Sequence, residues 1–137
     1  MPFDVRILST VNLVLQSLLV VALMAAVYLV RKKRDLKIHC LIIRIAVPLQ
    51  VIAILGVMLP SMFGYIGNEQ TSLFMAIEIL AHHTLGLVVI ALWVYVSILF
   101  RRGAGSLPRM VTAMKVAFWL WLVVFLVGLH IYLTRWV

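Results

Sequence analysis

Long apolar stretches separated by short polar segments dominate the chain. An α-helix needs about 20 predominantly apolar residues to cross the hydrocarbon core of a bilayer, and each stretch reaches that length. Because the connecting segments are short, we expect successive helices to be antiparallel neighbours. The pattern predicts an all-α integral membrane protein, an up-and-down bundle of four transmembrane helices with one domain over residues 1–137. The predicted spans are residues 7–30, 38–60, 72–100 and 111–133.

Basic residues are concentrated in two of the connecting segments. Segments 31–37 and 101–110 hold most of the chain's 12 lysines and arginines. Cytoplasmic loops of membrane proteins carry such an excess of positive charge. The charge pattern therefore predicts a multi-pass protein of the cell membrane, with these two loops in the cytoplasm and both termini on the outer side.

Composition narrows the class of protein further. Hydrophobic residues make up 66% of the chain, which excludes an ordinary soluble domain and makes membrane lipid a partner. The net charge of +8 lies mainly in the loops, where membrane orientation explains it, so we exclude nucleic acid as a partner. Cys40 is the chain's single cysteine and excludes an intrachain disulfide.

Recognisable catalytic motifs are missing from the sequence. We find no glycine-rich phosphate loop, no nucleophile with a partnered base and no paired carboxylates. A stand-alone hydrolase or transferase is therefore not expected. Whether the chain takes part in an enzyme stays open, and an electron carrier or a subunit of a membrane oxidoreductase fits this pattern better.

Three histidines, His82, His83 and His130, lie inside predicted spans. Placing an ionisable side chain within a membrane costs free energy, so such residues usually have a function. At 1.5 Å per residue, His82 and His83 lie about 15 Å from the outer end of their helix, and His130 about 7 Å from the outer end of its own. Helix tilt lets these depths coincide. A ligand could therefore bridge the third and fourth helices in the outer half of the membrane.

A b-type haem is the first candidate ligand. Haem iron held by two histidines needs one imidazole from each of two helices at the same height. Adjacent residues point about 100° apart, so only one of His82 and His83 can face the iron. We assign His83 and His130 as the ligands, with His82 hydrogen-bonded to Glu78, and the exchange of His82 and His83 stays open. Gly86, one turn further, leaves room for a porphyrin face.

Copper is the alternative ligand of the same pair, His83 and His130. Imidazole and thioether groups both suit copper, and Met58, Met62 and Met75 also fall toward the outer side. The absence of any cofactor is the remaining alternative, because histidines can hydrogen-bond neighbouring helices and methionines can simply pack. For the polar residues Gln16 and Gln50, which lie inside two other spans, we expect the same role of joining helices.

Several segments resemble a known family. KIHCLIIRIAVPLQVIAIL, EILAHHTLGLVVIALWVYVSILFRRG and MKVAFWLWLVVFLVGLHIYL resemble a four-helix membrane domain of unknown function that is linked to the assembly of haem-copper terminal oxidases. The resemblance covers about residues 37–133. The stretch AHHTLGLVVIAL is also similar to the histidine-bearing helices of small b-type membrane cytochromes. The positions that match the oxidase-assembly family are His39, His82 or His83, Trp119, Trp121, Gly128 and Tyr132.

Together these features predict a b-type cytochrome-like membrane protein that transfers electrons within or to a respiratory or other redox complex. Other membrane subunits of that complex, and a quinone, are the expected partners. One alternative is a cofactor-free accessory subunit of a larger membrane enzyme, such as a terminal oxidase or a monooxygenase. The other is an assembly factor that handles copper or haem for a terminal oxidase.

Overall fold

The computed structural model describes residues 5–66, 72–101 and 107–137. Within these ranges, four helices are long and apolar enough to cross a membrane, which confirms the prediction of a multi-pass, all-α protein. Many large apolar side chains are exposed on the outside of the helices, where lipid contacts them. The four spans are Arg6–Lys33, Leu36–Phe63, Leu73–Arg101 and Leu107–Trp136.

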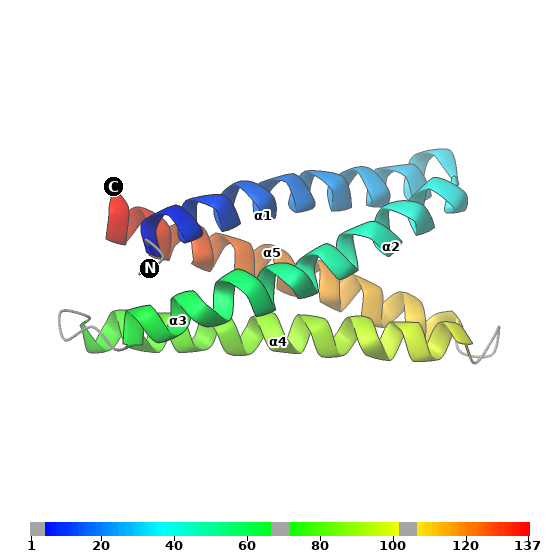
Figure 1. Cartoon of the computed structure of the whole chain (residues 1–137). Helices are drawn as coiled ribbons and strands as arrows, with labels where there is room; N and C mark the ends of the chain where they lie inside the picture. The colour runs from blue at the N-terminus through cyan, green and yellow to red at the C-terminus, as the bar shows by residue number, and fades with distance from the viewer. Residues whose placement is uncertain (1–4, 67–71, 102–106) are drawn as a thin grey trace.

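The bundle consists of two helical hairpins (Figure 1). α1 (Val5–Tyr28) pairs with α2 (Leu36–Ala53), and α4 (Leu73–Arg101) packs extensively against α5 (Leu107–Trp136). α1 begins and α5 ends at the same end of the bundle, which we call the terminal end (Figure 1). We call the opposite end, where α1 turns into α2, the basic end.

The connection between α1 and α2 is tighter than expected. A π-helical turn, Leu29–Lys33, extends α1, so only residues 34 and 35 separate the helices and the predicted seven-residue loop 31–37 is wrong in its extent. Arg34 has a left-handed backbone with φ of 53°, and its N–H donates to the carbonyl of Leu29. The Asp35 carboxylate then caps α2 by accepting from the Ile38 N–H at 3.0 Å.

The second span changes its geometry near the terminal end. α2 continues through Pro48, but the residues Ile54–Met58 form a π-helical turn before α3 (Leu59–Ile66). Leu59 donates its N–H to the carbonyl of Ile54, five residues back, and Pro60 has no N–H to donate into the turn. The turn shifts the buried face by one residue. Ala46, Gln50 and Ala53 are buried before this shift, and Ile54, Met58 and Ser61 are buried after it.

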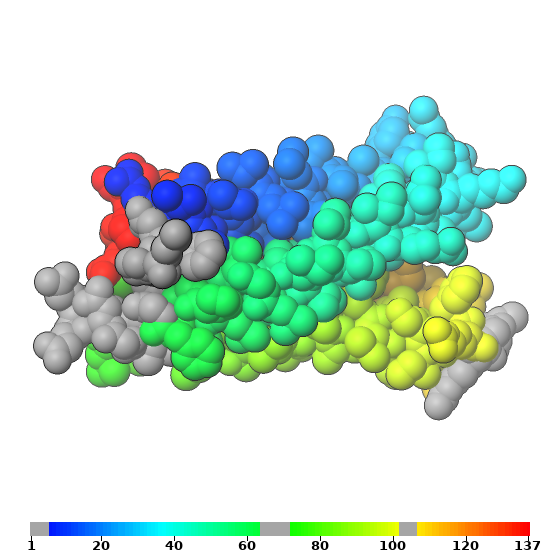
Figure 2. Space-filling view, viewed as in Figure 1, coloured from blue at the N-terminus to red at the C-terminus, as the bar shows by residue number. Residues whose placement is uncertain are grey.

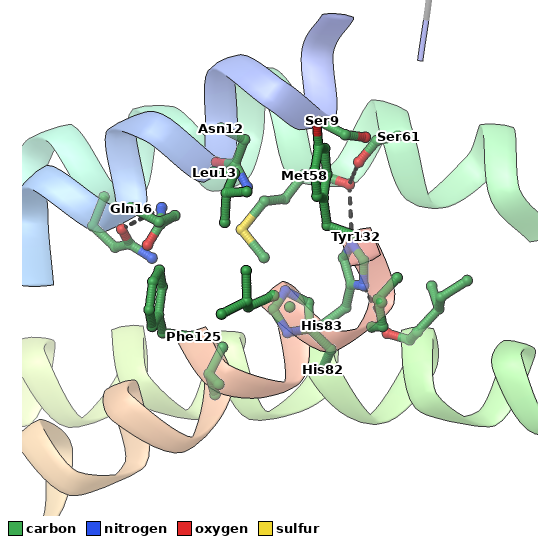
Figure 3. Close-up of a pocket in the computed structure, with 16 residues that line it drawn as sticks. Ser9, Asn12, Leu13, Gln16, Met58, Ser61, His82, His83, Phe125 and Tyr132 are labelled. Atoms are coloured by element: carbon green, nitrogen blue, oxygen red, sulfur yellow. Dashed lines mark hydrogen bonds between the residues drawn. The ribbon is translucent and has the colours of Figure 1, made fainter. Parts of the chain in front are cut away.

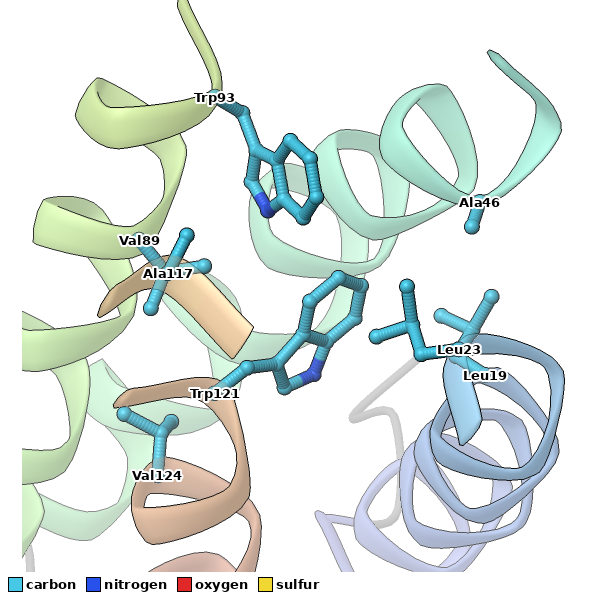
Figure 4. Close-up of a cluster of buried hydrophobic side chains, with 8 residues drawn as sticks. All are labelled: Leu19, Leu23, Ala46, Val89, Trp93, Ala117, Trp121 and Val124. Carbon is cyan, nitrogen blue, oxygen red and sulfur yellow. The ribbon is translucent and has the colours of Figure 1, made fainter. Parts of the chain in front are cut away.

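A hydrophobic cluster fills the middle of the bundle (Figure 4). Its largest members, Trp93 of α4 and Trp121 of α5, meet edge to face with ring centroids 6.3 Å apart. Aliphatic side chains from all four spans surround them, so the cluster separates the terminal end from the basic end. The members are Leu19, Leu23, Ala46, Val89, Trp93, Ala117, Trp121 and Val124.

Candidate functional site

A polar pocket lies between the helices toward the terminal end (Figure 3). Its volume is about 80 Å³, enough for a few water molecules or one ion. Polar side chains from every span line it, which is unusual inside a membrane bundle because each polar group there needs a partner. These include Ser9, Asn12, Ser61, His82, His83 and Tyr132, next to the thioether of Met58.

Two buried glutamines, Gln16 and Gln50, line the pocket, and Gln16 lies on the side of the basic end (Figure 3). Gln16 of α1 donates to Gln50 of α2 at 2.8 Å, and the indole N–H of Trp121 donates to Gln16 at 3.3 Å. This network joins α1, α2 and α5, so the expectation that the two glutamines join helices is confirmed. Tyr132, which also lines the pocket, is hydrogen-bonded through its hydroxyl group to the hydroxyl group of Thr10 at 2.9 Å.

His83 connects α4 to the π-helical turn. Its Nε2 lies 3.0 Å from the carbonyl oxygen of Met58, and its Nδ1 lies 2.7 Å from that of Ile79 (Figure 3). The hydroxyl of Ser61 donates to the same Met58 carbonyl at 2.9 Å. A neutral imidazole donates to one of these oxygens at a time and a doubly protonated ring to both. Either way, backbone oxygens occupy both ring nitrogens of His83.

His82 faces α5 instead. A Cβ added at Gly128 would lie 2.7 Å from Cε1 of His82, so the imidazole packs directly on the glycine backbone. The Nδ1 atom of His82 is buried without a hydrogen-bond partner among the described residues. When the proton of a neutral imidazole is on Nε2, Nδ1 carries the lone pair that a metal ion requires.

Asn12 supplies a second buried polar atom without a partner. Its side-chain oxygen, Oδ1, accepts no hydrogen bond from any described residue. Leaving a buried polar group unpaired costs about 1–3 kcal/mol, and a bound water or ion is one way to satisfy such an atom. Asn12 and His82 both line the pocket, on α1 and α4 respectively. No hydrogen bond joins Asn12 to His82, so a small bound molecule or ion could serve as the partner of both unpaired atoms.

Glu78 and His130 lie outside the pocket. His130 Nδ1 is 3.0 Å from the Glu78 carboxylate, and the two side chains are 57% and 21% exposed. The expected partner of Glu78 was His82, but the structure pairs Glu78 with His130 across α4 and α5. His130 lies two residues beyond Gly128, hence about 200° around α5 from the position that faces His82. The rotation of α5 thus turns His130 away from the other two histidines.

The described residues do not fit a haem held by His83 and His130. Backbone carbonyls occupy both nitrogens of His83, and His130 pairs with Glu78 at an exposed position. A Cβ at Gly86 would lie 3.9 Å from the Met58 methyl group, so Met58 occupies the space expected for a porphyrin. The pocket of about 80 Å³ is also far below the roughly 300–1,000 Å³ of typical cofactor pockets. Haem b stays a prediction, which a spectrum can test.

Two groups that can serve as ligands of a soft metal ion line the pocket. Among the described residues, no three histidine, cysteine, aspartate or glutamate side chains gather into a metal cluster. Imidazole and thioether ligands together suit copper, however, and His82 and Met58 line the same pocket. Met62 and Met75 pack beside Ile79 and Ile131, in a small cluster next to the pocket.

Sequence reasoning missed several residues of this site. Asn12 was not singled out, although a polar residue one turn before Gln16 in the first span was a usable signal. The contact of His82 with Gly128 could not be anticipated, because it depends on the rotation of both helices. None of the family models, curated proteins or solved structures compared with the chain matches it, so the comparisons identify no family and the resemblance to the oxidase-assembly family stays a prediction.

Proposed function

We propose that this protein binds copper(I) in the polar pocket and handles the ion for a membrane redox complex such as a terminal oxidase. The observation that carries the proposal is the unpartnered Nδ1 of His82, buried in a pocket that the Met58 thioether also lines. The site would hold copper through the His82 imidazole and the Met58 sulfur, with the Asn12 oxygen as an additional donor. The bound ion would also satisfy the two buried polar atoms that the helices leave unpaired.

The chemistry of the donors favours copper over harder ions. Thioether sulfur is a soft ligand that selects copper(I), whereas calcium and magnesium require several oxygen ligands. The Gly128 backbone holds the ring of His82 in place, as the neighbours of metal-binding histidines commonly do. A metal needs a deprotonated imidazole nitrogen, which the unpartnered Nδ1 of a neutral His82 would supply.

The distribution of charge supports placing this site in the outer half of the membrane. With the basic loops in the cytoplasm of a cell-membrane protein, the pocket opens in the outer half of the bilayer. Met62 and Met75, which pack beside Ile79 and Ile131 next to the pocket, would then provide a soft entry route for the ion. Other membrane subunits of the redox complex are the proposed recipients.

Metal analysis of the purified protein tests the proposal. After loading with copper(I) in competition with a chelator, we expect about one ion per chain, with affinity falling more than about tenfold in His82→Ala and in Met58→Leu. Met58→Leu keeps the volume of the side chain, so a loss in this variant does not reflect a disrupted core. His130→Ala is the matched control, because His130 lies outside the pocket, and it should retain the full copper content.

Two results would contradict the proposal. Copper binding that survives both His82→Ala and Met58→Leu would exclude the pocket as the site. A sharp b-type spectrum in the reduced-minus-oxidised difference, lost in His130→Ala, would establish the haem protein predicted from the sequence instead.

A further inference from the structure

Hollows larger than the polar pocket open at the basic end of the bundle. The α1–α2 hairpin diverges there from the α4–α5 hairpin, and a hollow opens between α2 and α4 (Figures 1 and 2). On another side of the bundle, a groove of about 510 Å³ runs between α1 and α5. This volume is within the range of roughly 300–1,000 Å³ typical of ligand sites. The divergence of the hairpins therefore creates a site that is absent from the tightly packed middle of the bundle.

The walls of the groove are apolar. Side chains of α1 and α5 form them, and His39 of α2 closes the back, buried, with its Nδ1 3.0 Å from the carbonyl of Ala26. Such a surface suits a hydrocarbon chain lying parallel to the helices. The apolar lining includes Leu23, Met24, Val27, Ile43, Phe118 and Leu122.

Charge is confined to two cationic side chains. Arg31, in the π-helical end of the first span, and Lys115 of α5 line the groove, and none of the described lining residues is acidic. Long basic side chains extend from apolar surfaces toward the phosphate level of a bilayer. Basic pockets between transmembrane helices bind anionic headgroups in this way. The groove thus combines an apolar wall with a cationic rim.

Trp93 adds an independent observation at the inner wall of the groove. It is only 5% exposed, and its indole N–H has no hydrogen-bond partner among the described residues. Trp93 and Lys115 each lie about 12 Å along their helix from its basic end, so they occupy similar depths. A ligand with a hydrogen-bond acceptor just below a phosphate, such as the ester of a phospholipid, could accept from this N–H.

We propose that the groove binds one anionic phospholipid. Its phosphate lies between Arg31 and Lys115, an ester oxygen accepts from Trp93, and an acyl chain packs between α1 and α5. The lipid fills the space that the diverging hairpins leave open, and thereby joins them at the basic end. This site is distinct from the proposed copper pocket and does not depend on it.

Native mass spectrometry of the delipidated protein tests this assignment. Phosphatidylglycerol should bind in one tight step, whereas phosphatidylcholine, which has no net charge, should not. In the double variant Arg31→Gln/Lys115→Gln, we expect the affinity for phosphatidylglycerol to fall roughly 10- to 30-fold. The matched control is Lys37→Gln/Arg109→Gln, which removes the same charge from exposed positions outside the groove lining and should keep the tight step.

The control pair distinguishes a built site from general attraction between opposite charges. Equal losses in the two double variants would show attraction to the net charge alone and would overturn the proposal. Equal binding of the anionic and the zwitterionic lipid would also overturn it. A tight dimer that forms without lipid and dissociates in Arg31→Gln/Lys115→Gln would assign the groove to a second copy of the chain instead.

Discussion

The two ends of this bundle are built from the same four spans but pack differently. At the terminal end, the helices converge around a small polar pocket, which His82, His83, Asn12 and Ser61 line. At the basic end, the hairpins separate and leave an apolar groove more than six times larger, from about 80 Å³ to about 510 Å³. We propose a small ion for the first site and a lipid for the second.

Two local features account for the convergence. The π-helical turn Ile54–Met58 shifts the buried face of the second span by one residue, so that Met58 and Ser61 face the pocket. Gly128 removes a side chain from α5, so that the ring of His82 can lie on its backbone within the α4–α5 hairpin. His83 then joins this hairpin to the π-helical turn of the second span, whereas the two hairpins diverge at the basic end (Figure 1). Close approach in this bundle therefore depends on small, specific backbone features.

Substitution of Gly128 should cause the largest loss of stability at the terminal end. In Gly128→Ala, the new methyl carbon would lie 2.7 Å from Cε1 of His82, so the ring would have to move. Overpacking of this kind costs about 1–3 kcal/mol. Thermal or denaturant unfolding in detergent measures this loss.

Gly86→Ala provides the matched control for Gly128→Ala. A Cβ at Gly86 would meet the nearest atom, the Met58 methyl, at an ordinary contact distance of 3.9 Å. Alanine favours a helix over glycine, so the stability should stay unchanged or rise by up to about 1 kcal/mol. A double variant, Gly128→Ala/His82→Ala, should recover most of the loss because the clashing ring is gone. Equal stability of Gly128→Ala and the wild type would contradict the close contact.

Removal of the His83 imidazole should weaken the link between α4 and the π-helical turn. His83→Leu loses the bond to the Met58 carbonyl, which retains the hydroxyl of Ser61 as a donor. We expect a loss of about 1 kcal/mol, as for a typical buried hydrogen bond. Hydrogen exchange should increase locally at residues 54–61. His130→Leu, which changes an exposed side chain, should alter stability by less than about 0.5 kcal/mol, and an equal loss there would contradict the assigned roles.

The spans were predictable from the sequence because lipid imposes a simple requirement. Each helix must present enough apolar residues to cross the hydrocarbon, so residues 7–30 and 111–133 were found within a few positions of the observed helices. The polar connections were less predictable. Arg34 and Asp35 form a two-residue turn that depends on a left-handed backbone and a cap, whereas the sequence shows only a run of charge.

The depth of the three histidines along their helices was predictable from the sequence, but the direction in which each side chain points was not. His82, His83 and His130 do lie toward the terminal end, yet they point in three directions: toward α5, toward the π-helical turn and toward Glu78. In helices that are apolar on every side, the periodicity of the sequence contains little information about which face is buried. The π-helical turn was not predictable for the same reason, because a shift of one residue exchanges one apolar side chain for another.

The glutamine pair lies at the boundary between the two regions and should contribute the smallest effect. Gln16 donates to Gln50 at 2.8 Å inside the bundle, where such bonds contribute only about 0.6 kcal/mol on average. A double-mutant cycle with Gln16→Leu and Gln50→Leu should therefore give a coupling energy of about 0.6 kcal/mol, measured by unfolding in detergent. Trp121→Phe in the same cycle tests whether its 3.3 Å bond to Gln16 strengthens that coupling. A coupling energy near zero would mean that the pocket is closed by the surrounding apolar cluster rather than by the glutamines, and that the polar region ends at His82.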